Sequence, residues 1–116
     1  MAQQAYRTSE VHSAYRVLLA LRDDLRTMEA RGRQQLKYPY CQKIVNGQLF
    51  ALAECLGDTN AADSFLRQST RYFIADRSGA GAPTNKLTRD YIRQTIESYD
   101  NHTGPPIWRS RTNTAN

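Results

Sequence analysis

Apolar residues recur at steps of three and four positions in four separate blocks of the chain, and this period is that of α-helices with one buried face. The first block contains Val11, Ala14, Leu18, Leu21, Leu25 and Met28. A strand would need alternating apolar and polar residues, and no such pattern lasts more than a few positions. A length of 116 residues fits one domain with one core. The sequence therefore predicts an all-α fold, a bundle of about four amphipathic helices.

Capping residues and glycines set the bounds that we predict for the four helices. The predicted spans are 9–31, 39–56, 59–77 and a last helix that starts at residue 84 or 85 and fades at about 101. We expect Thr8 or Ser9 to cap the first helix, Asp58 or Thr59 to cap the third, and Gly57 to end the second. The segment SGAGAPT, residues 78–84, is small and ends in proline, which predicts a loop inside the domain.

The end of the chain differs from the rest in composition. Residues 104–116 contain two prolines and show no apolar period, so we predict a helical bundle domain over 1–103 and a flexible, extended C-terminal tail over 104–116. Ile107 and Trp108 form an isolated apolar pair in this tail. Two alternatives stay open for the pair, which docks either on its own domain or on another molecule.

The second predicted helix is apolar around most of its circumference, which predicts the central and most buried element. Gly47 lies in its middle, where glycine costs about 1 kcal/mol relative to alanine. The glycine therefore indicates that another helix or a ligand backbone approaches closely. Cys41 and Cys55 fall in the same helix about 21 Å apart, which is too far for a disulfide bond between them. We expect both cysteines to be small core residues of a protein in a reducing compartment.

Motifs that carry known chemistry are absent from the sequence. We find no nucleophile elbow, phosphate loop, dinucleotide fingerprint, zinc-protease helix, paired CxxC ligands or EF-hand loop. His12 and His102 lie far apart in sequence and are expected to be surface or capping side chains. We therefore expect no enzyme, no catalytic residue, no metal and no other cofactor. The start of the chain lacks an apolar signal region and no segment approaches a membrane span, so we expect a cytoplasmic protein.

Positive charge is the sequence feature that points to a function. The chain has a formal charge of +5, and 13 of its 16 cations are arginines, which bind phosphate and carboxylate groups in a planar, bidentate manner. Arginines recur in pairs four residues apart, about 6 Å along a helix, a spacing that suits successive phosphates. Ion pairs within the protein are the alternative, for example Asp63 with Arg67 and Glu97 with Arg93. The candidate nucleic-acid-binding residues are Arg22, Arg26, Arg67, Arg71, Arg89, Arg93, Lys37 and Lys43.

The charges also cluster by segment. Residues 16–43 hold seven cations and three anions, residues 67–93 hold six and two, and residues 44–66 hold none and three. If the first helix lies beside the third or fourth, the two basic regions merge into one track for a nucleic-acid backbone. Interleaved tyrosines would stack on bases in such a track, although packing is the more frequent use of tyrosine. They are Tyr38, Tyr40, Tyr72 and Tyr91.

The basic, helix-rich character of the chain and its segment KIVNGQLFALAECL, residues 43–56, resemble the small subunits of class 1 CRISPR effector complexes. The resemblance covers about a dozen residues beyond size and class. It implies a non-catalytic protein that assembles in several copies with other subunits of a ribonucleoprotein. It also implies that basic surface residues hold the backbone of single-stranded DNA or RNA, either the target or the displaced strand.

An alternative from another class stays open. The chain would then be a helical protein-interaction adaptor, such as a phage or plasmid accessory protein. Its arginines would meet acidic partner surfaces, and Ile107 and Trp108 would dock into a groove of the partner.

Overall fold

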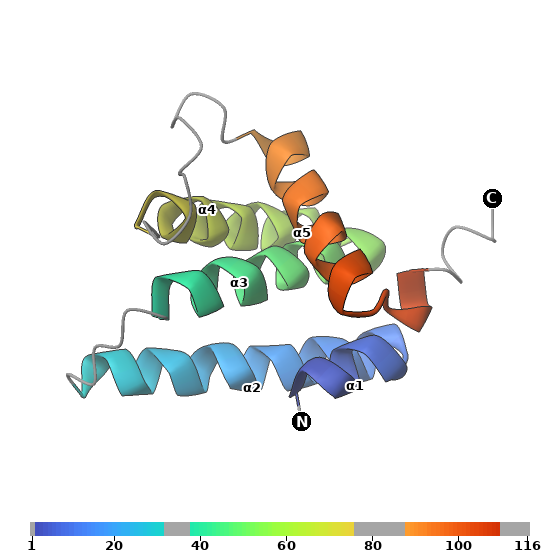
Figure 1. The fold of residues 1–116 in the computed structure, drawn as a ribbon, viewed down its shortest axis with the longest axis horizontal. Coiled ribbons are helices and arrows are strands. Elements are labelled where there is room, and N and C mark those ends of the chain that lie inside the picture. Colours follow the sequence, from blue (N-terminus) through green and yellow to red (C-terminus); the bar gives the residue numbers. More distant parts are fainter. Residues whose placement is uncertain (1, 32–37, 76–87, 110–116) are drawn as a thin grey trace.

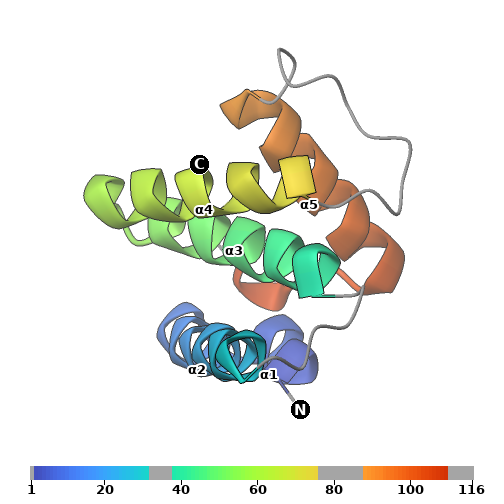
Figure 2. The same cartoon turned by 90° about the vertical axis from the view of Figure 1, so that its left-hand side faces the viewer.

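The computed structural model describes residues 2–31, 38–75 and 88–109, and every regular element in these ranges is a helix (Figure 1). The predicted all-α bundle is therefore confirmed. Helices α3 and α4 lie side by side, α2 lies below them and crosses them at an angle, α5 crosses them steeply, and the short α1 lies beside α2 (Figure 2). The helices are α1 (Ala2–Thr8), α2 (Val11–Ala30), α3 (Tyr38–Cys55), α4 (Thr59–Ala75) and α5 (Arg89–Thr103).

Helix α3 is the central element, as its apolar circumference predicts. It packs against α2, α4 and α5. Its side chains supply a large part of the core, which they share with Leu18 of α2, Phe65 of α4 and Ile96 of α5. The buried apolar residues of α3 are Ile44, Val45, Leu49, Phe50, Leu52 and Ala53.

Gly47 marks the place where α5 crosses α3. A Cβ atom at this position would overlap the side chain of Ile96. The interpretation of Gly47 as a point of close helix approach is therefore confirmed, and the approaching element is a helix. Ten residues later, Gly57 ends α3 with a φ of 77°, a left-handed conformation that glycine adopts without strain.

One predicted helix start, that of the first helix, is wrong, and its cap explains the difference. Helix α2 is capped by Glu10, whose carboxylate accepts backbone N–H groups of His12 at 3.0 Å and Ser13 at 2.8 Å. The expected residues Thr8 and Ser9 do not cap α2, because residues 2–8 form the separate helix α1, which lacks an apolar stripe. Helix α5 begins at Arg89, capped by Thr88. The expected start at residue 84 or 85 and the loop 78–84 lie outside the described residues.

The predicted cap of α4 and the end of α5 are closer to expectation. The carboxylate of Asp58 accepts the backbone N–H of Ala61 at 3.0 Å, so Asp58 is the capping residue of the two candidates. Helix α5 continues to Thr103, where Gly104 follows with a φ of 127°. Within the described ranges, no helix combines the length and the apolar character needed to cross a membrane.

The first part of the predicted tail packs on the bundle. Trp108 is 5% exposed, its indole N–H donates to the backbone carbonyl of Tyr6 at 3.1 Å, and the two rings meet edge to face at 5.7 Å. Ile107 points outward and is 45% exposed. Of the two alternatives for this pair, docking on its own domain is therefore the correct one for Trp108. Residues 110–116 lie outside the described residues.

The buried carboxylate of Asp100 joins the start of the chain to its end. Asp100 on α5 is 1% exposed and accepts three hydrogen bonds, from the Tyr6 hydroxyl at 2.6 Å, the Gln48 amide at 3.0 Å and the Arg109 guanidinium at 2.8 Å. Burial raises the pKa of Tyr6 far above its usual value, and the charge of Asp100 raises it further. The phenol therefore stays protonated and remains a donor. This cluster links α1, α3, α5 and the segment after α5.

Replacing Asp100 with alanine should lower the free energy of unfolding by about 3–5 kcal/mol, because Arg109 would keep a largely buried charge without its partner. Asp24 is an exposed aspartate on α2 and provides the control. Asp24→Ala should change stability by less than about 0.5 kcal/mol. Urea unfolding followed by circular dichroism measures both, and similar losses for the two variants would contradict the assignment.

Gly47→Ala should destabilise the protein by about 1–3 kcal/mol through overpacking against Ile96, although alanine is the better helix former. The matched test is a double-mutant cycle with Ile96→Ala, which removes the overlapping atoms. The second substitution should cost less in the Gly47→Ala background than in the native protein. Additive losses would show that the two positions do not touch.

Candidate nucleic-acid interface

Two of the three arginine pairs lie on α2 and α4. Arg26, Arg67 and Arg71 are exposed. Arg22 is more covered, with 18% of its side chain exposed, because its guanidinium lies over the Phe65 ring at 5.5 Å. Arg22 also pairs with the neighbouring Asp23 at 3.1 Å.

Helix α3 lies between α2 and α4, and α2 is inclined to both of these helices (Figure 2). Their side chains meet at three points along their length. Tyr15 packs edge to face on Phe65 at 6.0 Å, Arg22 covers the same ring, and Tyr72 donates a hydrogen bond to Glu29 at 3.4 Å. The structure therefore brings together the two helices that carry the first two arginine pairs. We call the outer faces of α2 and α4 that carry the exposed Arg26, Arg67 and Arg71 and the partly covered Arg22 the α2–α4 surface.

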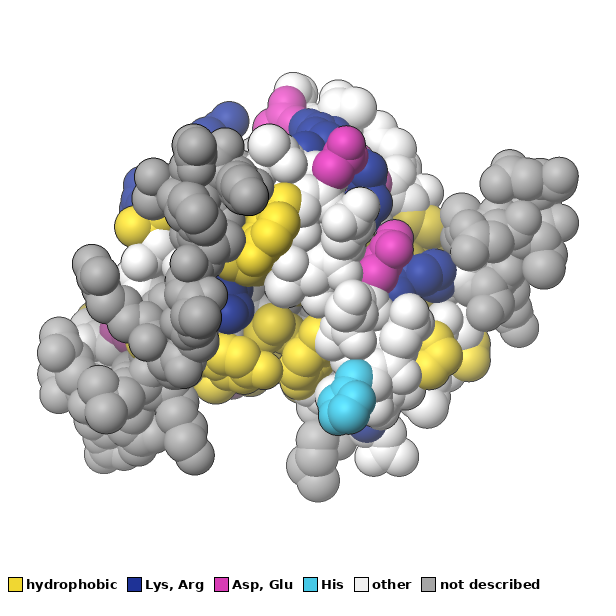
Figure 3. Space-filling view, turned by 45° about the horizontal axis from the view of Figure 1, so that its top comes forward, with side chains coloured by type: hydrophobic (Ala, Val, Ile, Leu, Met, Phe, Trp, Pro, Cys, Tyr) yellow, Lys and Arg dark blue, Asp and Glu magenta, His cyan; other side chains and the backbone are white. Residues whose placement is uncertain are grey.

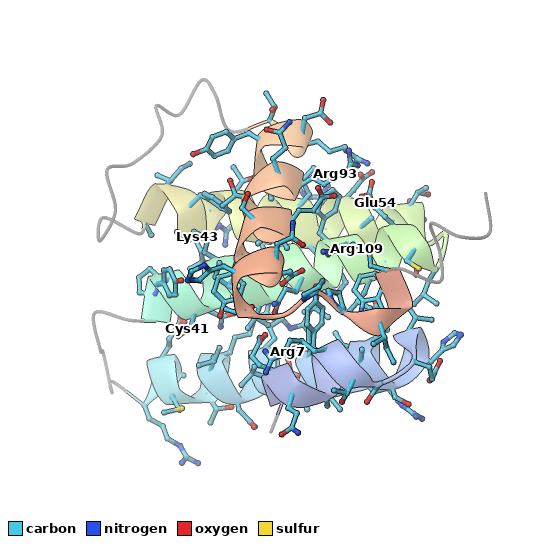
Figure 4. The ribbon with its side chains drawn as sticks, turned by 45° about the vertical axis from the view of Figure 1, so that its right-hand side comes forward. Arg7, Cys41, Lys43, Glu54, Arg93 and Arg109 are labelled. Carbon is cyan, nitrogen blue, oxygen red and sulfur yellow. The ribbon has the colours of Figure 1, made fainter. Side chains whose placement is uncertain are left out.

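The third arginine pair is engaged in ion pairs across α5, α3 and α4. Arg89 binds Glu54 at 3.0 Å and Asp63 at 2.5 Å. Arg93 binds Glu54 at 2.8 Å and Asp90 at 3.2 Å, and the hydrogen bonds with Glu54 raise the pKa of Arg93 (Figure 4). Basic and acidic side chains accordingly alternate over this side of the molecule (Figure 3).

The partners within the protein differ from those that helical spacing predicts. Asp63 binds Arg89 rather than Arg67, which lies four residues along its own helix. The carboxylates that bind Arg93 are Glu54 and Asp90 in place of Glu97. No local spacing points to Glu54, because it lies 35 and 39 residues from its arginines.

Of the two lysines among the candidate residues, the structure describes the surroundings of one, Lys43. Lys43 is half-buried, with its ammonium 4.9 Å from the centre of the Tyr40 ring and 5.0 Å from that of Phe73. This position between two rings links the first part of α3 to Phe73 of α4. Lys37 lies outside the described residues.

The tyrosines that are candidates for base stacking are used in packing where their side chains are described. Tyr91 meets Phe73 edge to face at 6.2 Å. Tyr72 is half-buried and bonded to Glu29, and Tyr40 lies beside Lys43 with 39% exposure. The side chain of Tyr38 lies outside the described part of the chain.

A cavity of about 260 Å³ lies between α3, α5 and the Trp108 segment. Its wall carries two cations, Arg93 and Arg109, and two carboxylates, Glu54 and Glu97. This balance gives it no preference for an anion. In the described ranges no group of three or more histidine, cysteine, aspartate or glutamate side chains could hold a metal ion. His12 and His102 are exposed at the start of α2 and near the end of α5.

No family model, no curated protein and no solved structure matches this chain.

Because the arginine pairs have different surroundings, we expect their replacement to change the stability of the protein by different amounts. Replacing Arg89 and Arg93 together by alanine should lower the free energy of unfolding by about 1 kcal/mol, because Glu54, Asp63 and Asp90 lose their partners at a partly exposed site. The loss should shrink in high salt, which screens these ion pairs. Replacing Arg67 and Arg71 together should change stability by less than about 0.5 kcal/mol. Thermal or urea unfolding of the two double variants checks the difference, and equal losses would contradict it.

Proposed function

We propose that this protein binds the backbone of single-stranded DNA or RNA without cleaving it, as a small subunit of a CRISPR-type ribonucleoprotein effector complex in the cytoplasm. Further copies of the chain and other subunits would be its partners in that complex. The resemblance of residues 43–56 to the small subunits supplies the class of assembly. The placement of the arginines supplies the mode of binding.

The observation that carries the proposal is the exposure of three arginines on α2 and α4, two helices whose side chains meet. Arg26 is exposed on α2, and Arg67 and Arg71 are exposed on α4. Arginines four residues apart are separated by about 6 Å along a helix, close to the separation of successive phosphates in an extended strand. Contacts of this kind read no bases, so binding should depend weakly on sequence and strongly on salt.

Helix α5 contributes less to this mode of binding than the sequence pattern suggests. Arg89 and Arg93 share three carboxylates, Glu54, Asp63 and Asp90, so a phosphate would have to displace protein partners to reach them. Their direct contact with nucleic acid remains a prediction. We place the main contacts on the α2–α4 surface.

The adaptor alternative has less to support it once the fold is known. It uses Ile107 and Trp108 as an exposed pair, but Trp108 is buried against Tyr6 and only Ile107 of the two is exposed. A single exposed apolar residue is ordinary for a protein surface.

Replacing Arg67 and Arg71 by alanine should weaken binding to single strands of any sequence, because each arginine neutralises a backbone phosphate. The slope of log affinity against log salt should fall by about 0.7 for each phosphate that the variant no longer neutralises. Fluorescence anisotropy with labelled DNA and RNA oligonucleotides across a salt series measures both quantities. The Arg89 and Arg93 double variant is the matched control and should lose less affinity. Absence of binding by the native protein at low salt would overturn the proposal, as would cleavage of the labelled strands.

A further inference from the structure

The cavity between α3, α5 and the Trp108 segment combines buried apolar residues with charged side chains. Its volume of about 260 Å³ lies just below the range of about 300–1,000 Å³ that is usual for sites of drug-sized ligands. The cavity therefore has space for one small ring system. Figure 4 shows three of its charged residues, Arg93, Glu54 and Arg109, along one edge of α5. The apolar lining includes Phe50, Ala51, Ile96 and Trp108.

Two of the four charged side chains in the lining have unused hydrogen-bonding capacity. Arg109 binds Asp100 through Nη2 at 2.8 Å, but its Nη1 is buried and has no hydrogen-bond partner. Glu97 is exposed and forms no hydrogen bond or ion pair with another residue of the described ranges. In contrast, Arg93 and Glu54 bind each other at 2.8 Å. A buried N–H group without an acceptor is unfavourable. The cavity thus presents one donor and one carboxylate to a ligand.

Flat surfaces border the same cavity. The guanidinium of Arg93 lies over the Phe50 ring at 5.8 Å, and that of Arg109 lies over the Trp108 ring at 5.3 Å. Nucleobases stack on aromatic rings and on the planes of arginine guanidinium groups. These surfaces therefore favour a planar ligand over a branched or flexible one.

The charges of the lining restrict the ligand further. Two cations and two carboxylates cancel, so the cavity favours an uncharged ligand over a phosphate or an amine. The ligand also needs N–H donors for Glu97 and an acceptor for Arg109. Guanine meets these conditions, because it is planar and uncharged. One of its edges carries two adjacent N–H groups that match the two oxygens of a carboxylate, and another edge carries the two acceptors that arginine binds.

We propose that this cavity binds a guanine base. Glu97 accepts hydrogen bonds from the two adjacent N–H groups of the base, and Nη1 of Arg109 donates to an acceptor on its other edge. The base is that of a free nucleoside or of a nucleotide within a strand. This site goes beyond the proposed function, because it uses none of the arginines of the α2–α4 surface.

Binding of the four nucleosides tests the proposal, because nucleosides have no phosphate and cannot report on backbone contacts. Isothermal titration calorimetry of the full chain should show binding of guanosine, with adenosine, cytidine and uridine at least about tenfold weaker. Trp108 is the single tryptophan and lines the cavity, so guanosine should also change its fluorescence. Inosine, which lacks the exocyclic amine of guanosine, should bind more weakly than guanosine.

Substitutions locate the site. Glu97→Gln keeps the shape of the side chain and should weaken guanosine binding about tenfold, because a charged acceptor is lost. Asp24→Asn is the matched control, since Asp24 is an exposed carboxylate on α2, and should change the affinity less than about twofold. Ala51→Leu should abolish binding by filling the cavity. The unfolding midpoint of each variant is followed by circular dichroism, and Glu97→Gln changes an exposed side chain and so tests the site even if Ala51→Leu does not fold.

Oligonucleotides distinguish the two sources of the base. A thymidine strand with one central guanosine should bind more tightly than an all-thymidine strand if the base comes from a strand. Equal affinities for these strands, together with binding of guanosine, assign the site to the free nucleoside.

Three results would overturn the proposal. They are absence of guanosine binding, equal affinities for the four nucleosides, and an unchanged guanosine affinity in folded Glu97→Gln. Each of them leaves the proposed function intact, because backbone binding is measured separately with oligonucleotides and the Arg67 and Arg71 variant.

Discussion

The buried carboxylate of Asp100 is the constraint on which the arrangement of this bundle depends. A charge that is 1% exposed is tolerable only when donors surround it, and here they come from three other parts of the chain. Tyr6 brings α1, Gln48 brings the centre of α3, and Arg109 brings the segment after α5. Removing any one of these donors leaves the Asp100 carboxylate with fewer hydrogen bonds to offset its burial. The crossing of α5 over α3 is therefore fixed by polar chemistry at one end and by Gly47 and Ile96 near its middle.

The sequence is sufficient to predict the elements whose signals are local. The apolar stripe of α2, the apolar circumference of α3 and the break at Gly57 all follow from spacing and backbone preference, and the structure confirms them. Helix α1 cannot be predicted in this way, because Tyr6 is its one fully buried residue and a single position has no period. Docking of Trp108 is equally hidden, since its partner lies 102 residues away.

The same division holds for the candidate site. The arginine pairs are visible in the sequence because they repeat at helical spacing, and the contact between α2 and α4 brings together the helices that carry two of them. The ion pairs that distinguish one arginine pair from the others involve residues far away in the sequence. Arg89 and Arg93 depend on Glu54, which reaches them from another helix. The contact of Glu29 with α4 is equally hidden in the sequence, since its partner Tyr72 lies 43 residues later.

The link between Tyr6 and Asp100 also orders events during synthesis. The two residues are 94 positions apart, so the phenol has no acceptor until almost the whole described chain has been made. At a translation rate of about 5–20 residues per second, that interval lasts about 5–20 seconds. Contacts among α2, α3 and α4 join neighbours in sequence and close short loops, which makes them fast to form. The nascent chain should therefore pair its first four helices early, while the Tyr6 phenol of α1 gains its buried acceptor and the Trp108 ring only when α5 and the segment after it emerge from the ribosome.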